Sequence, residues 1–163
     1  MSAMAGKTGQ AGMVKDGDSF MASVVVGERF AKDVMFDEAG ARAFAALVGD
    51  FNPAHHDKEF ATKGRFGRLI VCGPQTTGMM MAMTATYLAG KGVPLGLDYR
   101  FRFLKAVPVN EMATMEWVVV AVTPKPGLGD IVALEGTLTL HETGAVAVSG
   151  TGKAVLLDAG AGA

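Results

Sequence analysis

The sequence has little of several features that would point to a particular class of protein. Its single cysteine excludes an intramolecular disulfide and fits a reducing compartment. Charge of either sign is not in excess, because 15 basic residues almost balance 16 acidic ones and the net charge is −1. No global field therefore attracts nucleic acid or an anionic membrane.

Long hydrophobic runs are also missing. The longest, Met79 to Gly90, is interrupted by threonines and is shorter than the roughly 20 residues needed to cross a bilayer. Residues 1–18 contain no apolar segment of the kind that a secretory signal needs. We therefore expect a cytoplasmic protein that does not associate with membranes.

The residues that are present suit one globular domain. Half of the 163 residues are apolar and only 19% are charged, which is enough to build a real core. Gly, Ala and polar residues dominate the first 17 positions, and the last six have a similar composition. We therefore expect a weakly packed arm over residues 1–17, a single domain over residues 18–157 and a tail over residues 158–163.

The first half of the domain predicts extended segments followed by a helix. Residues 20–26 and 29–36 are read as extended, and Asp37 is a typical N-cap for a helix beginning at residue 38. Gly49 stands where a left-handed residue commonly ends a helix. The residues expected on the apolar face of this helix are Ala41, Phe44, Ala45, Leu47 and Val48.

Two more helices and then only strands follow along the chain. Asp57 can cap a short helix over residues 58–63, and a longer apolar helix runs from about Pro74 to Ala89. Residues 117–122 are apolar on both faces, so we expect their strand to be covered on both sides. An apolar helix followed by antiparallel strands predicts an α+β fold, with a curved sheet wrapped around the helix. The four strands are expected at about residues 95–104, 113–122, 130–140 and 145–156.

The stretch VGDFNPAHHD, residues 48–57, gathers the polar groups best suited to chemistry. Asp50 and His55 lie on either side of an Asn-Pro turn, in which Pro53 keeps Asn52 out of the helical region. A rigid turn can aim a carboxylate and an imidazole at one water, so that one group accepts a proton while the other donates one. The same residues also suit an ordinary surface turn. Spacing alone leaves both interpretations open.

Spacing also leaves the role of the neighbouring histidine open. His56 adjoins His55, and either ring could face inward. A metal site is not favoured, because His55, His56 and Asp57 are consecutive and cannot all converge on one ion from a strand or a helix. The sequence also has no CxxC or HExxH motif. We therefore predict no metal ligand and no cofactor.

The motif GDFNPAHHD, followed by GRFGRLIVCG and an apolar helix, resembles the MaoC-like (R)-specific enoyl-CoA hydratase and dehydratase family. The family motif runs D-x-N-P-x-H-x-D. The resemblance extends from about Phe36 through the strand YRFRFLKAVPVNE, and more loosely to the C-terminus. It implies a hot-dog fold and a homodimer or higher homo-oligomer, with the acyl chain entering near the subunit interface.

The resemblance also implies roles for individual residues of the motif. It makes Asp50 and His55 the catalytic pair, and in doing so it selects His55 over His56. It assigns Asn52 and Pro53 to shaping the loop that holds the pair. The acyl-CoA thioester is then the expected partner of this site.

A third catalytic group is implied at the start of the long apolar helix. In the family, the backbone N–H of the glycine at this point polarises the thioester carbonyl, and here that glycine is Gly73. The unpaired N–H groups and positive dipole of a helix N-terminus suit such a role, and Pro74 supplies no N–H of its own. The histidine that precedes this glycine in the family is Cys72 here, which we expect to be a small buried residue.

Basic side chains close to the motif are candidates for binding CoA. Lys63, Arg65 and Arg68 lie in the segment TKGRFGR, where they could meet the nucleotide phosphates. The alternative interpretation is a solvated loop.

We therefore predict a hydro-lyase that reversibly hydrates a trans-2-enoyl-CoA to a (3R)-hydroxyacyl-CoA, with substrate and stereochemistry taken from the resemblance. One alternative is a hot-dog acyl-CoA thioesterase, although residues 74–89 contain none of the acids that many such enzymes use on this helix. Another is a non-catalytic acyl-thioester-binding protein, whose ligand affinity would survive replacement of Asp50. The acyl chain length and the choice between CoA and acyl carrier protein stay open.

Overall fold

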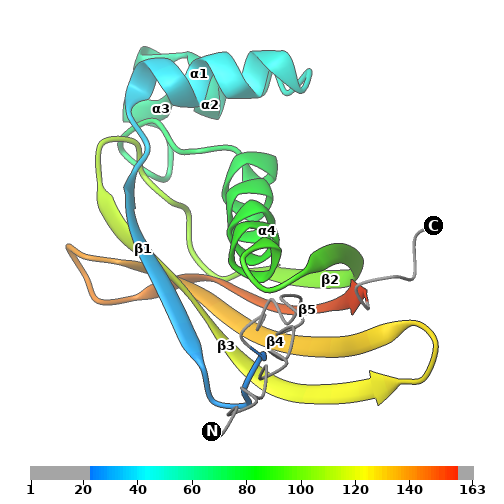
Figure 1. The fold of residues 1–163 in the computed structure, drawn as a ribbon. Coiled ribbons are helices and arrows are strands. Elements are labelled where there is room, and N and C mark those ends of the chain that lie inside the picture. The colour runs from blue at the N-terminus through cyan, green and yellow to red at the C-terminus, as the bar shows by residue number, and fades with distance from the viewer. Residues whose placement is uncertain (1–22, 158–163) are drawn as a thin grey trace, which may run out of the picture.

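The computed structural model describes residues 23–157, which form one curved antiparallel sheet and four helices (Figure 1). The expected arm over residues 1–17 and tail over residues 158–163 lie outside this range. The helices are α1 (Glu38–Leu47), α2 (Pro53–His56), α3 (Lys58–Lys63) and α4 (Gly73–Ala89). The strands are β1 (Arg29–Met35), β2 (Val93–Phe103), β3 (Met112–Lys125), β4 (Gly129–Leu140) and β5 (Val146–Leu157).

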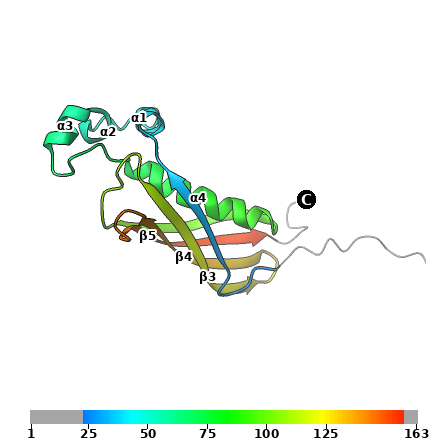
Figure 2. The same ribbon diagram turned by 90° about the vertical axis from the view of Figure 1, so that its left-hand side faces the viewer.

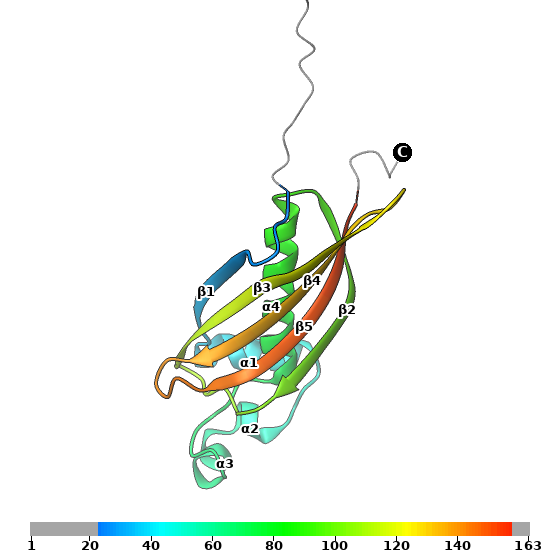
Figure 3. The same cartoon turned by 90° about the horizontal axis from the view of Figure 1, so that it is seen from below.

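The sheet has the order β1-β3-β4-β5-β2, and every neighbouring pair of strands is antiparallel (Figure 3). The long strands β3, β4 and β5 follow one another through hairpins and form the centre. Strands β1 and β2 come from earlier in the chain and occupy the two edges. The predicted four strands at the C-terminal end are confirmed, each within a few residues of its expected bounds.

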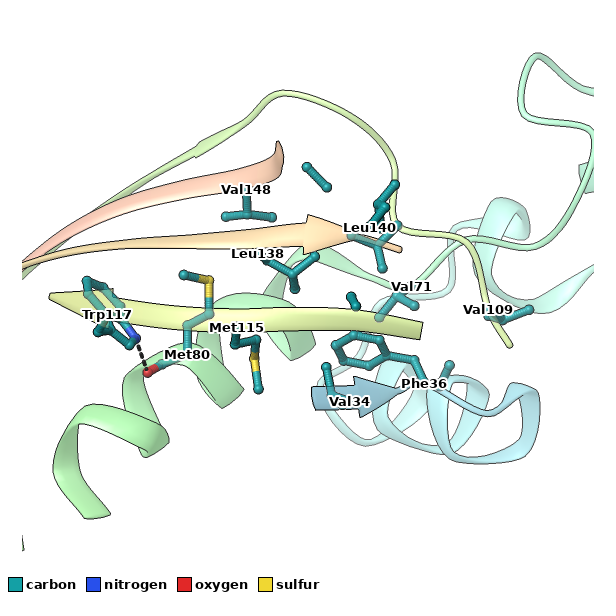
Figure 4. Packing of buried hydrophobic residues seen from close by; sticks show 14 of the residues in the cluster. Val34, Phe36, Val71, Met80, Val109, Met115, Trp117, Leu138, Leu140 and Val148 are labelled. Atoms are coloured by element: carbon teal, nitrogen blue, oxygen red, sulfur yellow. Dashed lines mark hydrogen bonds between the residues drawn. The ribbon is translucent and has the colours of Figure 1, made fainter. Parts of the chain in front are cut away.

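Helix α4 lies across the concave face of this sheet, as predicted (Figure 2). Its residues Met80, Thr84 and Leu88 recur at the spacing of one helical face and are all fully buried. Met80 lies among side chains from the central strands, including Met115, Trp117 and Leu138 (Figure 4). Among residues 23–157, no helix is long and apolar enough to cross a membrane.

The prediction that residues 117–122 are covered on both sides is wrong. Trp117 and Val119 are buried under α4, whereas Val118 is half-buried and Val120 is 40% exposed. The reason is that α4 covers only the concave face, and no other described element lies on the convex face (Figure 3).

The segment predicted as extended over residues 20–26 forms no strand where the structure describes it, and it ends in a turn. Residues 23–25 belong to no strand, and a turn follows at Val26 and Gly27. Gly27 has a φ of +90°, a conformation that interrupts an extended chain and that glycine adopts without strain. The chain therefore joins the sheet only at Arg29.

Helix α1 begins as its sequence predicts, because the side chain of Asp37 accepts a hydrogen bond from the N–H of Gly40 at 2.8 Å. Its predicted apolar face is only partly correct. Ala41 and Ala45 are buried, but Leu47 is 82% exposed and Val48 is 47% exposed. The helix lies beyond the end of the sheet, so only its alanine side meets the rest of the chain (Figure 2).

Candidate active site

The loop after α1 is held by hydrogen bonds within its own few residues. Gly49 adopts the expected left-handed conformation, with a φ of +77°, and the N–H of Asp50 returns to the carbonyl of Ala45 at 2.9 Å. Asn52 then caps α2, because its side-chain oxygen accepts from the N–H of Ala54 at 3.1 Å. Pro53 occupies the first helical position, where a missing N–H costs nothing. The short α2 therefore places residues 55 and 56 at a fixed distance from residue 50.

This loop brings Asp50 and His55 together. The Nε2 atom of His55 lies 3.4 Å from Oδ2 of Asp50. The other ring nitrogen, Nδ1, lies 2.8 Å from the carbonyl oxygen of Ile70, which can only accept a hydrogen bond. Nδ1 must therefore carry a proton, and in neutral His55 the lone pair is on Nε2, beside the Asp50 carboxylate.

His56 faces the opposite way and holds the backbone of the loop. Its Nε2 atom donates to the carbonyl oxygen of Asp50 at 2.6 Å, and its ring lies beside that of Phe51, with 6.0 Å between centroids. The structure thus resolves the ambiguity between the two histidines: the ring of His55 faces the Asp50 carboxylate. We assign His56 to positioning Asp50 through its main chain.

Helix α4 begins at Gly73, next to this pair. Cys72 at the N-cap provides no side-chain cap, Pro74 has no N–H, and the N–H of Gln75 donates to the carbonyl oxygen of Cys72 at 3.1 Å, so the N–H of Gly73 is left for another acceptor. A Cβ atom at Gly73 would lie 3.0 Å from the ring of Phe103, which leaves little room for any larger residue. Gly73 and His55 line the same pocket.

The pocket has a volume of about 770 Å³ and opens to solvent. Its walls are mostly apolar, with His55 at one side and the basic residues Arg65 and Lys105 also on its lining. A cleft with a few polar groups among apolar walls is typical of a small-molecule site. The other residues that line it are Phe66, Ile70, Val71, Gly73, Thr76, Phe103, Leu104, Ala106, Val107, Pro108 and Val148.

The three predicted CoA-binding residues have different surroundings. Arg65 lines the pocket, as expected. Lys63 lies outside the pocket lining, paired with Glu59 on the exposed side of α3 at 2.6 Å. Arg68 is held between the carboxylates of Glu111 and Glu142, so the structure favours a role in packing for it.

Lys105 was not identified from the sequence, although it lines the pocket beside His55 and Arg65. It follows β2, about fifty residues after the motif, and only the folded sheet brings it there. Its position directly after the alternating segment YRFRFL would have been the only available signal.

Cys72 is fully buried, as predicted. Burial raises the pKa of its thiol, and the neighbouring Asp50 carboxylate raises that pKa further. The reactive thiolate is therefore scarcer at pH 8 than in an exposed cysteine. We expect an aromatic disulfide reagent to leave native protein unlabelled over a period in which urea-unfolded protein reacts completely. Rapid native labelling, with loss of activity that substrate prevents, would contradict this structural role.

The chain is similar to known proteins over most of its length. Residues 19–138 match the family model described as MaoC like domain. The chain is 35% identical to the (R)-specific enoyl-CoA hydratase of Aeromonas caviae over 130 residues, which are 78% of this chain and 92% of the relative. It is 28% identical to a 3-hydroxybutyryl-CoA dehydratase of Methylorubrum extorquens, over 57% of this chain and 64% of that protein.

Solved structures confirm the predicted hot-dog fold. The (R)-hydratase from A. caviae involved in PHA biosynthesis superposes with a TM-score of 0.73 and 32% identity, covering 83% of this chain and 98% of that one. An R-hydratase from Pseudomonas aeruginosa has a TM-score of 0.73 and 25% identity, with 85% of each chain covered.

Proposed function

The chain belongs to the MaoC-like dehydratase family, and we propose that it reversibly hydrates a trans-2-enoyl-CoA to a (3R)-hydroxyacyl-CoA. The observation that carries this proposal is the approach of Asp50 to 3.4 Å from His55, a residue that lines the same pocket as Gly73 at the start of α4. The names of two relatives, a hydratase and a dehydratase, correspond to the two directions of this reaction.

The pair acts on one water molecule. The Asp50 carboxylate and the Nε2 lone pair of His55 are both acceptors, so a water that donates to both has its oxygen turned toward the substrate. That oxygen adds to the β-carbon of the enoyl group, and the proton taken from the water passes to the α-carbon on the same face. Water thus adds across the double bond with no proton gained or lost overall.

The N–H of Gly73, at the start of α4, holds the thioester oxygen. Addition at the β-carbon pushes electron density onto this oxygen, which becomes enolate-like. The N–H of Gly73, together with the positive end of the helix dipole, stabilises that charge as it develops. No electrons are exchanged with an external carrier, so the proposal includes no cofactor.

A thioesterase uses the same substrates, so the test must separate water addition from thioester cleavage. We expect loss of the conjugated-enoyl absorbance when the protein meets a panel of trans-2-enoyl-CoAs, with no free CoA in a parallel thiol-trapping assay. CoA release without hydration would indicate a thioesterase. Ligand binding that is unaffected by Asp50→Asn, with no turnover in the wild type, would indicate an acyl-thioester-binding protein.

We further propose that Arg65 and Lys105 bind the phosphates of CoA at the mouth of the pocket. Guanidinium and ammonium groups are the usual partners of phosphate, and both side chains line the same pocket as His55. A single buried cysteine fits a reducing compartment, so a cytoplasmic location remains our proposal.

A homodimer is proposed because two neighbouring surfaces of the chain lack a cover. Strand β2 is an edge of the sheet and exposes Val93, Leu95 and Leu97, each by more than half of its surface. An exposed apolar edge of this length would otherwise pair indiscriminately with other chains.

The second uncovered surface belongs to α4. The 17 residues of this helix carry no charge, even at the exposed positions Gly78, Ala82, Ala85 and Ala89. A second copy that pairs its β2 with this β2 by a two-fold axis would cover both surfaces.

Light scattering should therefore give twice the chain mass of 16.9 kDa for the wild type. The double substitution Leu95→Lys and Leu97→Lys places like charges opposite each other and should shift the mass toward the monomer. The control is Leu128→Lys, which changes a residue that is 43% exposed at the β3–β4 hairpin, where β5 separates it from β2. A monomeric wild type, or dissociation caused equally by the control, would contradict this interface.

A further inference from the structure

Beyond the active-site groups, the space between α4 and the sheet is closed by a row of aromatic rings. Across four neighbouring strands, paired residues run in the order Phe101, Gly150, Gly136 and Trp117. The two glycines have no side chains, and the rings at the ends of the row lean over them. A Cβ atom at Gly150 would lie 2.8 Å from the ring of Phe101 and 3.3 Å from that of Trp117.

The rings of this row are fixed in place. Trp117 is fully buried and donates from its indole N–H to the carbonyl oxygen of Met80, at 3.0 Å (Figure 4). Phe101 packs edge-on against Trp117, with 6.3 Å between centroids. The next ring along β2 is that of Tyr99. Its hydroxyl group is hydrogen-bonded to the hydroxyl group of Thr84 in α4 at 2.6 Å, and the ring is also edge-on to Trp117. Together Phe101 and Trp117 form what we call the ring wall.

The ring wall lies one row of residues beyond the active-site pocket. The adjacent row contains Phe103 and Val148, which pair with each other and both line the pocket. Consecutive residues on one face of a strand are about 6.6 Å apart. On the helix, Thr76 lines the pocket, whereas Met80, one turn later, meets Trp117. The residues of the strand and those of the helix therefore give the same result. The pocket extends inward by only about one row of residues before it reaches the rings.

We propose that the ring wall restricts this enzyme to short acyl chains, with Phe101 as a specificity-determining residue. With the thioester oxygen at Gly73 and the double bond at His55, the acyl chain points inward past Thr76 and Val148. A four-carbon chain ends before the rings, whereas an eight-carbon chain meets Phe101. This inference rests on the proposed function, because it takes the acyl thioester as the ligand of that pocket.

The test compares kcat/KM for trans-2-butenoyl-, hexenoyl-, octenoyl- and decenoyl-CoA. We expect the wild-type value for octenoyl-CoA to lie at least about tenfold below that for butenoyl-CoA, since misfit of a few carbons commonly costs this much. Phe101→Ala should raise the octenoyl-to-butenoyl ratio at least about tenfold. Phe101→Leu is the second variant, because it opens less space and disturbs folding less. The melting temperature of each variant is measured to show that it is folded.

Phe30→Leu is the matched control. Phe30 pairs with Trp117 in the same row, but its ring is stacked on Tyr87 outside the active-site pocket, at 3.9 Å between centroids. Its ratio should equal that of the wild type. A wild type that uses decenoyl-CoA as well as butenoyl-CoA would overturn the proposal, as would Phe101 variants that fold but leave the ratio unchanged.

Binding measurements separate this proposal from the proposed function. If no enoyl-CoA is hydrated, the proposed function fails, but titration calorimetry with saturated butanoyl- and octanoyl-CoA still tests the ring wall. Tighter binding of butanoyl-CoA supports a short pocket. Equal or tighter binding of octanoyl-CoA overturns it.

Discussion

Replacing Asp50 by Asn, or His55 by Gln, is expected to lower kcat/KM for enoyl-CoA hydration by roughly 10²- to 10⁴-fold, the usual contribution of general acid–base groups. Asn cannot accept a proton as a carboxylate does. In His55, the hydrogen bond from Nδ1–H to the Ile70 carbonyl leaves the lone pair on Nε2. Gln has no ring nitrogen that could accept a proton in this way. Hydration of butenoyl-CoA, followed by absorbance, measures the loss.

The double variant distinguishes a catalytic pair from two independent residues. Because the two groups are proposed to hold the same water, removing the second should add little to the loss caused by the first. Additive, small losses that follow melting temperature would instead indicate an ordinary polar turn. Both substitutions nearly preserve shape, so melting temperature and oligomeric mass should stay close to those of the wild type.

His56→Gln is the matched control for His55→Gln. It changes the adjacent residue, whose ring nitrogen donates to the main chain of Asp50 and not to its carboxylate. Gln keeps an N–H donor, so we expect a loss well below that of His55→Gln. The opposite order, with His56→Gln the more damaging change, would show that the motif was aligned wrongly by one position.

The sequence was sufficient where the determining contacts are local. The caps at Asp37 and Asp57 each act within three residues, so the pattern alone predicted them correctly. The approach of Asp50 to His55 depends on one Asn-Pro turn, which is also local. The start of α4 at Gly73 also depends on local residues and was predicted to within one position.

Long-range contacts were not predictable in this way. Arg68 was expected at the CoA phosphates, but its partners Glu111 and Glu142 lie 43 and 74 residues away along the chain. Lys105 reaches the pocket only through the pairing of β2 with β5. The prediction that residues 117–122 are covered on both sides failed for the same reason. An apolar run does not indicate which faces of its strand a helix will cover.

Trp117→Ala is expected to have the largest effect on stability. The side chain is fully buried, and it fills the space above Gly136, where a Cβ atom would overlap with its ring. Truncating a buried Trp typically costs about 3–5 kcal/mol, and the N–H bond to Met80 is lost as well. Since domains of this kind are stable by only about 5–15 kcal/mol, this variant should be close to unfolded at 37 °C. Urea unfolding followed by circular dichroism measures the free energy, because the chain has no second Trp to report by fluorescence.

Two further variants show which property of Trp117 matters. Trp117→Phe keeps a ring over Gly136 but lacks the N–H, so its loss should lie between those of the wild type and Trp117→Ala. Val118→Ala changes the next residue, which points to the uncovered convex face, and should cost no more than about 1 kcal/mol. Equal losses for Trp117→Ala and Val118→Ala would mean that the ring does not anchor α4 to the sheet. In that case Phe101 would have no fixed neighbour, and a flexible row of rings could not limit the length of an acyl chain.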